Sequence, residues 1–205
     1  MIKIEKVQIF NLEGAIRGMR NPLNSWDKSD SRNGREGFII GPEDLRLAQK
    51  LVKAGSDERK FLRQIVVSMD ITAPLYWWKE FDTYKVGTVA NSTSTMHTIH
   101  TKPFTRKDFS HDRMTLAALA CLDGVITVLE ERRKYFIETK APAAWNDIIQ
   151  LLPSSYNQMR TVTLNFENLL NQYNARKNHK LQEWRTYCLE IYCIPWFREI
   201  CTLGE

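Results

Sequence analysis

The chain has 205 residues, of which 43% are hydrophobic and 26% are charged, and its formal net charge is +5. These proportions are normal for a soluble globular protein with a real core, and no apolar run approaches the roughly 20 residues of a membrane-spanning helix. We predict one domain over residues 1–205. The basic charge permits nucleotide or nucleic-acid binding without requiring it, because net charge governs non-specific attraction more than function.

Cysteine usage and the N-terminal sequence predict a cytoplasmic protein. Residues 1–10 alternate apolar and charged side chains and lack the continuous apolar segment of a signal peptide. The cysteines form no C-x-x-C pair, which argues against zinc and favours reduced thiols. His97 and His100 have a spacing that two metal ligands can share on a helix, but no third ligand is nearby, so we predict no metal site.

In the first half of the chain, turn residues and apolar periodicity predict a strand, a loop, a helix and a strand in turn. Residues 2–10 have the apolar alternation of a strand. Residues 14–41 predict an irregular loop, which is either solvated or ordered around a site. A helix is expected to begin at Pro42 and to be stopped by Gly55. The alternation over residues 64–72 predicts the clearest strand of the chain.

The remainder of the chain is predicted to be mostly helical. Apolar side chains recur there at helical spacing, and a proline interrupts the last segment. The expected helices cover residues 74–84, 112–139, 143–152, 161–177 and 181–200. Together with the strands, this order predicts an α+β fold in which a small antiparallel sheet packs with several long helices.

A central stretch without carboxylates is the first candidate for a binding site. From Thr83 to Lys107 there is no Asp or Glu, while Ser, Thr, Lys and Arg are frequent. Hydroxyl and amide donors with fixed positive charge suit an anionic ligand such as phosphate. A solvated, slightly basic loop explains the same composition, so both interpretations stay open.

A polar face on the helix expected over residues 161–177 is the second candidate. Amides are costlier helix formers than the Glu, Lys and Ala of ordinary surface helices, although a surface helix could carry them. They can make paired contacts with the edge of a flat heterocycle, and an arginine can clamp a phosphate or polarise a carbonyl. The residues on this face are Thr161, Asn165, Asn168, Gln172 and Arg176.

Three segments resemble the flavin-dependent thymidylate synthase family. The sequence FLRQIVVSMDITAP, residues 61–74, is similar to the family's strand that leads into Ala-Pro and a helix. The sequence TYKVGTVANSTSTMH, residues 83–97, falls where the family has R-H-R-x-x-S-x-N-x-x-S-x-R-Y. The sequence LPSSYNQMRTVTLNFENLLNQYNAR, residues 152–176, resembles its L-P…T-x-N…R segment. The resemblance extends over about residues 60–200.

The resemblance implies the family's fold, reaction and site. Members methylate dUMP to dTMP with methylenetetrahydrofolate, FAD relays a hydride from NADPH, and homotetramers share their active sites between subunits. Carried over, Arg176 would be the catalytic residue that holds the nucleotide base. The cofactor-binding residues would be Tyr84, Lys85, Asn91, Asn165 and Asn171. Thr88 and Ser94 would bind the substrate.

The signature also departs from the family pattern, which keeps alternatives open. Residues 83–85 read Thr-Tyr-Lys instead of Arg-His-Arg, residues 96–97 read Met-His instead of Arg-Tyr, and Glu167 stands where an Arg is usual. Arg17 and Arg20 of the N-terminal loop could replace the lost cations as substrate ligands. One alternative is a nucleotide-binding or nucleotide-modifying homologue that has lost standard FAD use. Another is a basic nucleic-acid-binding module, although no recognised motif of that kind is present.

Overall fold

The computed structural model describes residues 2–35 and 37–202. Their contacts divide these residues into two compact units. Unit 1 contains the described residues of 1–3, 71–83 and 91–160, and unit 2 contains those of 4–70, 84–90 and 161–205. The single domain expected from the sequence stays a prediction.

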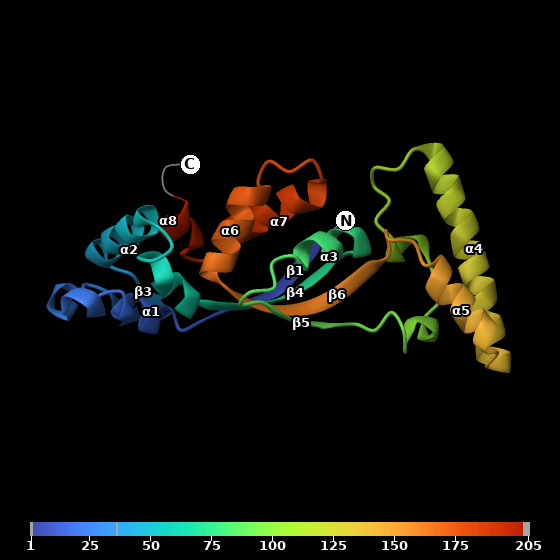
Figure 1. Cartoon of the computed structure of the whole chain (residues 1–205), viewed down its shortest axis with the longest axis horizontal. Helices are drawn as coiled ribbons and strands as arrows, with labels where there is room; N and C mark the ends of the chain where they lie inside the picture. Colours follow the sequence, from blue (N-terminus) through green and yellow to red (C-terminus); the bar gives the residue numbers. More distant parts are fainter. Residues whose placement is uncertain (1, 36, 203–205) are drawn as a thin grey trace. The chain divides into compact units, whose positions relative to one another are not determined.

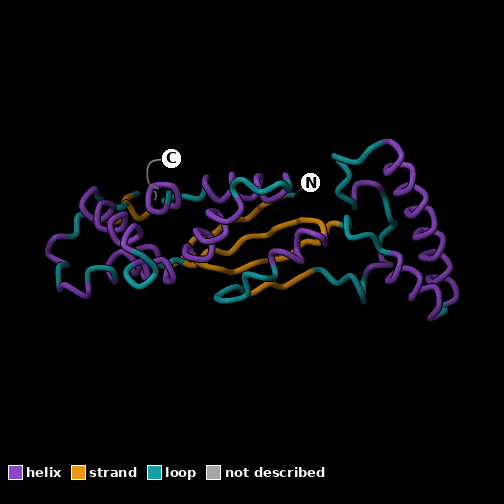
Figure 2. The backbone as a smooth tube through the Cα atoms, turned by 45° about the horizontal axis from the view of Figure 1, so that its top comes forward, coloured by secondary structure: helices purple, strands orange, loops and turns teal. Residues whose placement is uncertain are grey.

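Four strands, orange in Figure 2, form a small antiparallel sheet in the order β1-β4-β6-β5. The sheet consists of β1 (Lys3–Phe10), β4 (Val66–Pro74), β5 (Val89–Ser92) and β6 (Asn157–Asn165). The α+β fold expected from the sequence is therefore confirmed. In β4 every second side chain is fully buried, which is the pattern that the alternation over 64–72 predicted. A separate hairpin pairs β2 (Arg32–Gly34) with β3 (Gly37–Ile39).

Unit 2 contains most of the helices that are shorter than the long helix of unit 1 (Figure 1). They are α1 (Leu12–Gly18), α2 (Pro42–Ala54), the 3-10 helix η3 (Arg59–Gln64), α6 (Phe166–Arg176), α7 (Gln182–Tyr192) and α8 (Phe197–Cys201). Helix α2 confirms the expected start at Pro42, and it ends where Gly55 takes a φ of 129° that favours glycine. The last expected helix is divided into α7 and α8, because the chain turns at residues 193–196.

Unit 1 contains α3 (Leu75–Phe81) and a hairpin of α4 (Leu116–Thr139) and α5 (Pro142–Leu151), which pack side by side (Figure 1). Helices α3 and α4 are shorter than the sequence predicted, and α5 has the predicted length but begins and ends one residue earlier. The hydroxyl of Thr115 caps α4 by accepting from the backbone N–H of Ala118, so the helix begins there rather than near residue 112. The hairpin shares one apolar core, formed by Ile99, Phe104, Phe109, Leu122, Leu129 and Ile148.

The expectation of a helix over residues 161–177 is wrong in its first turn. Residues up to Asn165 continue β6, and the helix starts at Phe166. Val162 and Leu164 are buried while Thr161 and Thr163 are exposed, so this part of the chain follows the period of a strand. Thr161 consequently leaves the polar helix face, and its hydroxyl donates to Asp70 at 2.6 Å.

The stretch 14–41 is more regular than the irregular loop that its composition predicted. It contains most of α1, two 3-10 turns at residues 21–23 and 26–28, and the β2–β3 hairpin. The buried carboxylate of Asp44 fixes it to α2. Asp44 accepts from Arg20 Nε at 2.5 Å and from the hydroxyls of Ser29 and Ser31, each at 2.6 Å. One buried acid therefore orders a segment that lacks helical periodicity.

Asp30 completes this attachment from the loop side. Its carboxylate accepts from the backbone N–H groups of Glu43 and Asp44 at 2.9 and 3.1 Å. These groups belong to the first turn of α2, where N–H donors have no partner within the helix. The N-cap position of α2 is Gly41, which has no side chain that could accept hydrogen bonds from these N–H groups. A residue from the preceding loop therefore caps the helix. No helix within the described part of the chain is long and apolar enough to cross a membrane.

Candidate functional site

The first turn of α6 attaches the loop of residues 84–90 to the helix. Asn165 and Asn168 form a capping box, in which each side chain accepts from the backbone N–H of the other residue. Asn168 Nδ2 also donates to the carbonyl of Val86 at 2.7 Å. The expected polar face is thus used in part for helix capping and loop docking. The same is true of Gln172, which is fully buried and accepts from the hydroxyl of Tyr187 at 2.6 Å.

Gly87 allows the loop to approach the helix this closely. Its φ is 71°, a conformation that residues with a Cβ rarely adopt. A Cβ at this position would lie 3.1 Å from both Asn165 Nδ2 and Asn168 Oδ1. The sequence showed only an isolated glycine, and its contact with the helix could not be inferred from spacing.

The last residue of α6, Arg176, lies in a cluster with two aromatic side chains. Its Nε donates to the hydroxyl of Tyr84 at 2.8 Å. Its guanidinium lies 5.6 Å from the ring centre of Tyr84 and 5.1 Å from that of Trp184 on α7. A cation over the face of an aromatic ring is attracted by the ring's quadrupole, so both rings fix the orientation of the guanidinium. Sequence reasoning named Arg176 and Tyr84 but missed Trp184, whose place in the cluster depends on tertiary packing.

Two further residues of the loop have different environments. Lys85 is exposed, so its ammonium group can meet an anion from solvent. The hydroxyl oxygen of Thr88 is buried and has no hydrogen-bond partner within the described residues. Buried polar groups are nearly always paired in folded proteins, so this hydroxyl is an exception within the loop.

Asn91 and Ser94 belong to unit 1. Asn91 is exposed on β5. Ser94 Oγ accepts from the backbone N–H groups of Met96 at 3.1 Å and His97 at 2.8 Å, which holds the following turn. The chain after it is fixed by Trp145 Nε1, which donates to the carbonyl of Met96 at 3.1 Å.

Glu167 lies in an ion-pair cluster with two arginines of η3. It accepts from Arg59 Nε at 3.2 Å and from Arg63 Nε, and Arg59 also donates to Asn171 Oδ1 at 3.2 Å. Burial raises the pKa of Glu167, but hydrogen bonds from Arg63 and Arg59 outweigh it and lower the pKa below its ordinary value. The negative charge of Glu167 is therefore neutralised, and the two arginines bring positive charge to this turn of α6.

The N-terminal candidates Arg17 and Arg20 line one pocket of about 290 Å³, together with Trp26. Arg17 is exposed at this pocket. Arg20 is only 5% exposed, and besides pairing with Asp44 it donates from Nη1 to the carbonyl of Ser25. Its charge is neutralised inside the protein, so Arg17 is the better placed of the two for a phosphate. Among the described residues, no group of three or more His, Cys, Asp or Glu side chains could hold a metal ion.

Comparison with solved structures identifies the fold. A thymidylate synthase X (ThyX) from Helicobacter pylori with FAD and dUMP aligns with a TM-score of 0.76 over 98% of this chain and 97% of its own, at 15% sequence identity. The chain has a ThyX-like fold. A second structure of the flavin-dependent enzyme from Helicobacter pylori, also complexed with FAD and dUMP, aligns with a TM-score of 0.67 over 92% of both chains at 16% identity. No family model matches the sequence, and no curated protein matches it.

The ThyX-like fold agrees with the resemblance that the sequence shows. The three segments that carry the resemblance, residues 61–74, 83–97 and 152–176, include β4, the loop of residues 84–90 and the β6–α6 segment. Within unit 2, Tyr84 and Arg176 come together although 92 residues separate them in the chain. Arg59 and Arg63 were not among the sequence candidates, because only the paired Glu167 shows what they do.

Proposed function

We propose that the chain is a flavin-dependent thymidylate synthase-like enzyme that methylates the pyrimidine nucleotide dUMP with methylenetetrahydrofolate. The contact between Arg176 and Tyr84 carries the proposal. It joins the two segments that the family resemblance assigns to the nucleotide and the cofactor, and it holds a guanidinium in a defined orientation. The similar ThyX structures contain FAD and dUMP, which supports a nucleotide as the ligand.

In this proposal Arg176 binds the uracil base. A planar guanidinium presents paired N–H donors to a carbonyl oxygen and its neighbours, and its permanent charge polarises that carbonyl. Such polarisation favours attack at the base by stabilising negative charge on the oxygen. Thr88, Ser94 and Arg17 would bind the substrate's phosphate and sugar, and Arg20, paired with Asp44, would hold the segment that follows α1.

The donors of unit 2 fit a flavin dinucleotide. Lys85, Arg59 and Arg63 bring positive charge that suits its diphosphate, and Asn171 offers an amide for the ring or the ribose. When bound, FAD would supply the hydride transfer, with NADPH as the reductant. Tyr84, Asn91 and Asn165 complete the proposed cofactor set. Asn165 acts through its capping box, which fixes the start of α6.

A nucleotide-binding homologue without standard FAD use is the second candidate. It is favoured by the single cation among residues 83–85 and by Met96 and His97, which stand where the family has Arg-Tyr. Each lost charge-assisted hydrogen bond weakens binding by about 1.5–3 kcal/mol unless another donor replaces it. The two candidates therefore differ in flavin affinity and share nucleotide binding.

Ligand binding to the purified protein separates the two candidates. We expect the visible absorption of bound flavin, a rise in melting temperature on adding FAD, and a second rise on adding dUMP. Thermal stabilisation by dUMP alone, with neither flavin absorption nor an FAD response, would favour the homologue without FAD. Stabilisation by neither ligand would overturn both candidates. Adenosine monophosphate at the same concentration controls for stabilisation by any phosphate.

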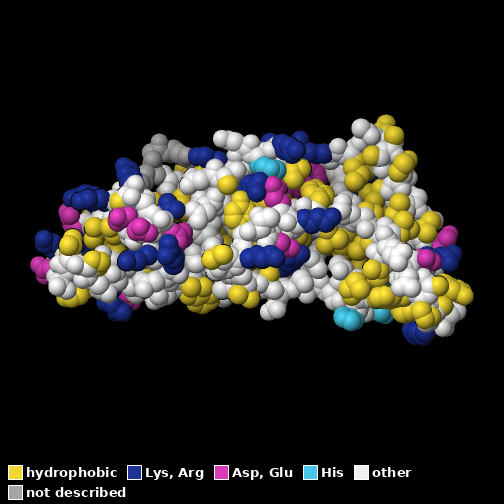
Figure 3. Space-filling model, viewed as in Figure 1, with side chains coloured by type: hydrophobic (Ala, Val, Ile, Leu, Met, Phe, Trp, Pro, Cys, Tyr) yellow, Lys and Arg dark blue, Asp and Glu magenta, His cyan; other side chains and the backbone are white. Residues whose placement is uncertain are grey.

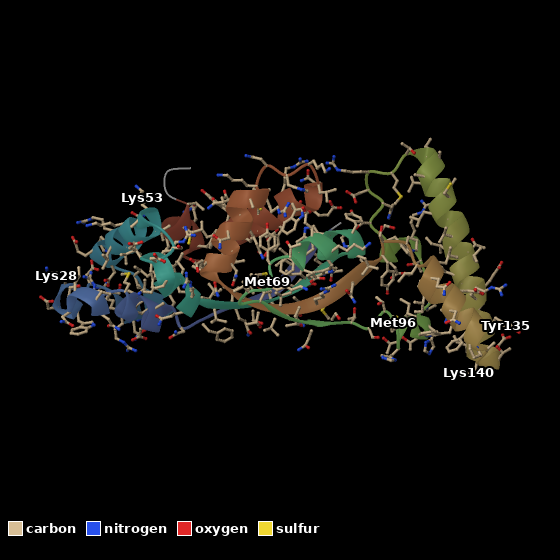
Figure 4. The ribbon with its side chains drawn as sticks, in the orientation of Figure 1. Lys28, Lys53, Met69, Met96, Tyr135 and Lys140 are labelled. Carbon is tan, nitrogen blue, oxygen red and sulfur yellow. The ribbon has the colours of Figure 1, made fainter. Side chains whose placement is uncertain are left out.

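We further propose that the chain assembles as a homotetramer through the outer face of α4. The first half of α4 is apolar on nearly all sides, which is typical of a helix that is buried. Yet Leu116 is 86% exposed and Val128 is 41% exposed in the single chain. Hydrophobic side chains cover much of α4 and α5 (Figure 3), and Tyr135 points from α4 away from α5 (Figure 4).

A charge on this face is expected to prevent assembly. Gly124 lies on the face, and a Cβ there would meet no atom within 4 Å. The Gly124→Lys variant should elute as a smaller species in size-exclusion chromatography with light scattering, while retaining the helical circular dichroism of the wild type. Gly124→Ala is the matched control, because it improves helix propensity by about 1 kcal/mol without adding charge. If both variants have the oligomeric state of the wild type, α4 does not form the interface.

A further inference from the structure

A second basic pocket lies where α6 ends and α7 begins. It has a volume of about 490 Å³, which is within the range of small-molecule sites. All of its lining residues belong to unit 2, and neither Arg176, Tyr84 nor Trp184 is among them. The lining residues are Tyr173, Lys177, Asn178, Gln182, Arg185, Cys188 and Leu189.

The charged side chains that line this pocket are all positive. Lys177 and Arg185 contribute two positive charges, and no residue that lines the pocket carries a carboxylate. Cys188 adds no negative charge, because burial raises the pKa of its thiol to about 12 and keeps it protonated at neutral pH. Lys and Arg side chains also gather over the connection between α6 and α7 (Figure 3). An anion would therefore meet no repulsive group inside the pocket.

Arg185 is held ready to bind such an anion. Its Nε and Nη2 donate to Gln182 Oε1 at 3.2 and 2.5 Å, and its Nη1 donates to the carbonyl of His179 at 3.0 Å. A guanidinium has five N–H donors, so these bonds leave one N–H on each of Nη1 and Nη2. Paired donors in a fixed plane match the oxygens of a phosphate group, and little side-chain entropy remains to be lost on binding.

An aromatic side chain lines the pocket beside the cations. Lys177 Nζ lies 5.4 Å from the ring centre of Tyr173, and that ring stacks on Tyr192 with the centres 6.1 Å apart. Asn178 adds an exposed amide that can bind an ester or sugar oxygen. The volume exceeds what one phosphate needs, so an organic phosphate fits the chemistry better than the free ion.

We propose that this pocket is a second anion-binding site, separate from the Arg176 cluster, that binds the phosphate group of a small organic molecule. Lys177 and Arg185 grip the phosphate, and Tyr173 contacts the organic part. The site does not depend on the proposed reaction, since it shares no lining residue with the Arg176 cluster.

Isothermal titration of the full chain, in a phosphate-free buffer of low ionic strength, tests the proposal. Phenyl phosphate is expected to bind one site per chain, more tightly than inorganic phosphate and with lower affinity at higher salt. The Arg176→Ala substitution should leave this binding unchanged, because Arg176 does not line the pocket. If phosphate binds as tightly as phenyl phosphate, the organic part of the proposal is wrong.

Substitutions in the pocket identify the binding residues. Arg185→Gln should weaken phenyl phosphate binding about tenfold or more, because it removes a charged, two-point contact. Arg185→Lys, which keeps the charge, should bind with intermediate affinity. Arg46→Gln on α2 removes the same charge at an exposed position and should change nothing. Lys177→Gln replaces Arg185→Gln if circular dichroism shows that the latter is unfolded.

Three outcomes overturn the site. Absence of any binding of phenyl phosphate would do so directly. Equal weakening by Arg46→Gln and Arg185→Gln would show that attraction is spread over the whole surface. If Arg176→Ala abolishes phenyl phosphate binding and Arg185→Gln does not change it, the ligand binds at the Arg176 cluster and not in this pocket.

Discussion

Replacing Arg176 with alanine is expected to weaken dUMP binding by at least about tenfold while the protein stays folded. A hydrogen bond from a charged donor contributes about 1.5–3 kcal/mol, which corresponds to about 10- to 150-fold in affinity. The side chain ends α6 and is half-buried between Tyr84 and the fully buried Trp184, so truncation uncovers that ring but removes no core side chain. Calorimetric titration with dUMP measures the loss, and circular dichroism checks the fold.

Two conservative variants show whether Arg176 binds the base through its shape as well as its charge. Arg176→Lys keeps the charge but loses the planar fork, so it should recover only part of the affinity. Tyr84→Phe removes the hydroxyl that accepts from Arg176 Nε and should weaken binding by a smaller factor. Arg46→Ala, an exposed arginine on α2, is the control and should bind like the wild type. Unchanged dUMP affinity in Arg176→Ala would show that the cluster is structural only.

The parts of the fold that were predicted correctly have strong local signals. The strict alternation in β4 reports a strand with one buried face, and Pro42 and Gly55 delimit α2 through backbone chemistry of their own. Where local patterns are ambiguous, the sequence misleads. Residues 161–165 fit a helical stripe and a strand equally well, and pairing within the sheet decides between them.

The candidate site was predictable only in part, for a similar reason. Arg176 and Tyr84 could be named from motifs, but their contact needs a loop to dock on α6, and that docking depends on Gly87. Glu167 seemed to remove a cation from the site. Its partners, Arg59 and Arg63, lie more than 100 residues earlier in the chain. Long-range ion pairs leave no periodic pattern in a sequence, so the restored charge appears only in the structure.

The same argument applies to Asp44, whose substitution is expected to have the largest effect on stability. Asp44 is fully buried, and its partner Arg20 is 5% exposed. Removing one member of a buried ion pair typically costs about 3–5 kcal/mol, because the other charge stays buried without compensation. In the wild type, the carboxylate of Asp44 accepts hydrogen bonds from the hydroxyls of Ser29 and Ser31. In Asp44→Asn, an amide NH₂ replaces one carboxylate oxygen, and this group donates hydrogen bonds and does not accept them. We expect the free energy of unfolding to fall by about this amount.

The pKa of Asp44 determines how the stability difference between wild type and Asp44→Asn changes with pH. Burial alone would raise the pKa of Asp44, but hydrogen bonds from Ser29, Ser31 and Arg20, with the charge of Arg20, hold that pKa below its ordinary value. A carboxyl group whose pKa is lower in the folded state stabilises the protein above its unfolded pKa of about 3.9. That stabilisation is lost as the pH falls from there through the folded pKa. The difference between wild type and Asp44→Asn should therefore be largest near neutral pH and shrink in acid.

Urea unfolding of both proteins between neutral pH and pH 3, roughly one unit below the unfolded pKa, measures this difference. The neighbouring Glu43→Gln variant is the matched control, because it removes one negative charge from the same helix turn. Glu43 pairs with Arg46, and both side chains are more than half exposed, so its loss should cost less than about 1 kcal/mol. If Asp44→Asn is no less stable than Glu43→Gln at neutral pH, the buried carboxylate does not hold residues 14–41 in place. In that case apolar packing around α1 must order the segment instead, since Ala15 and Ile16 are its most deeply buried side chains.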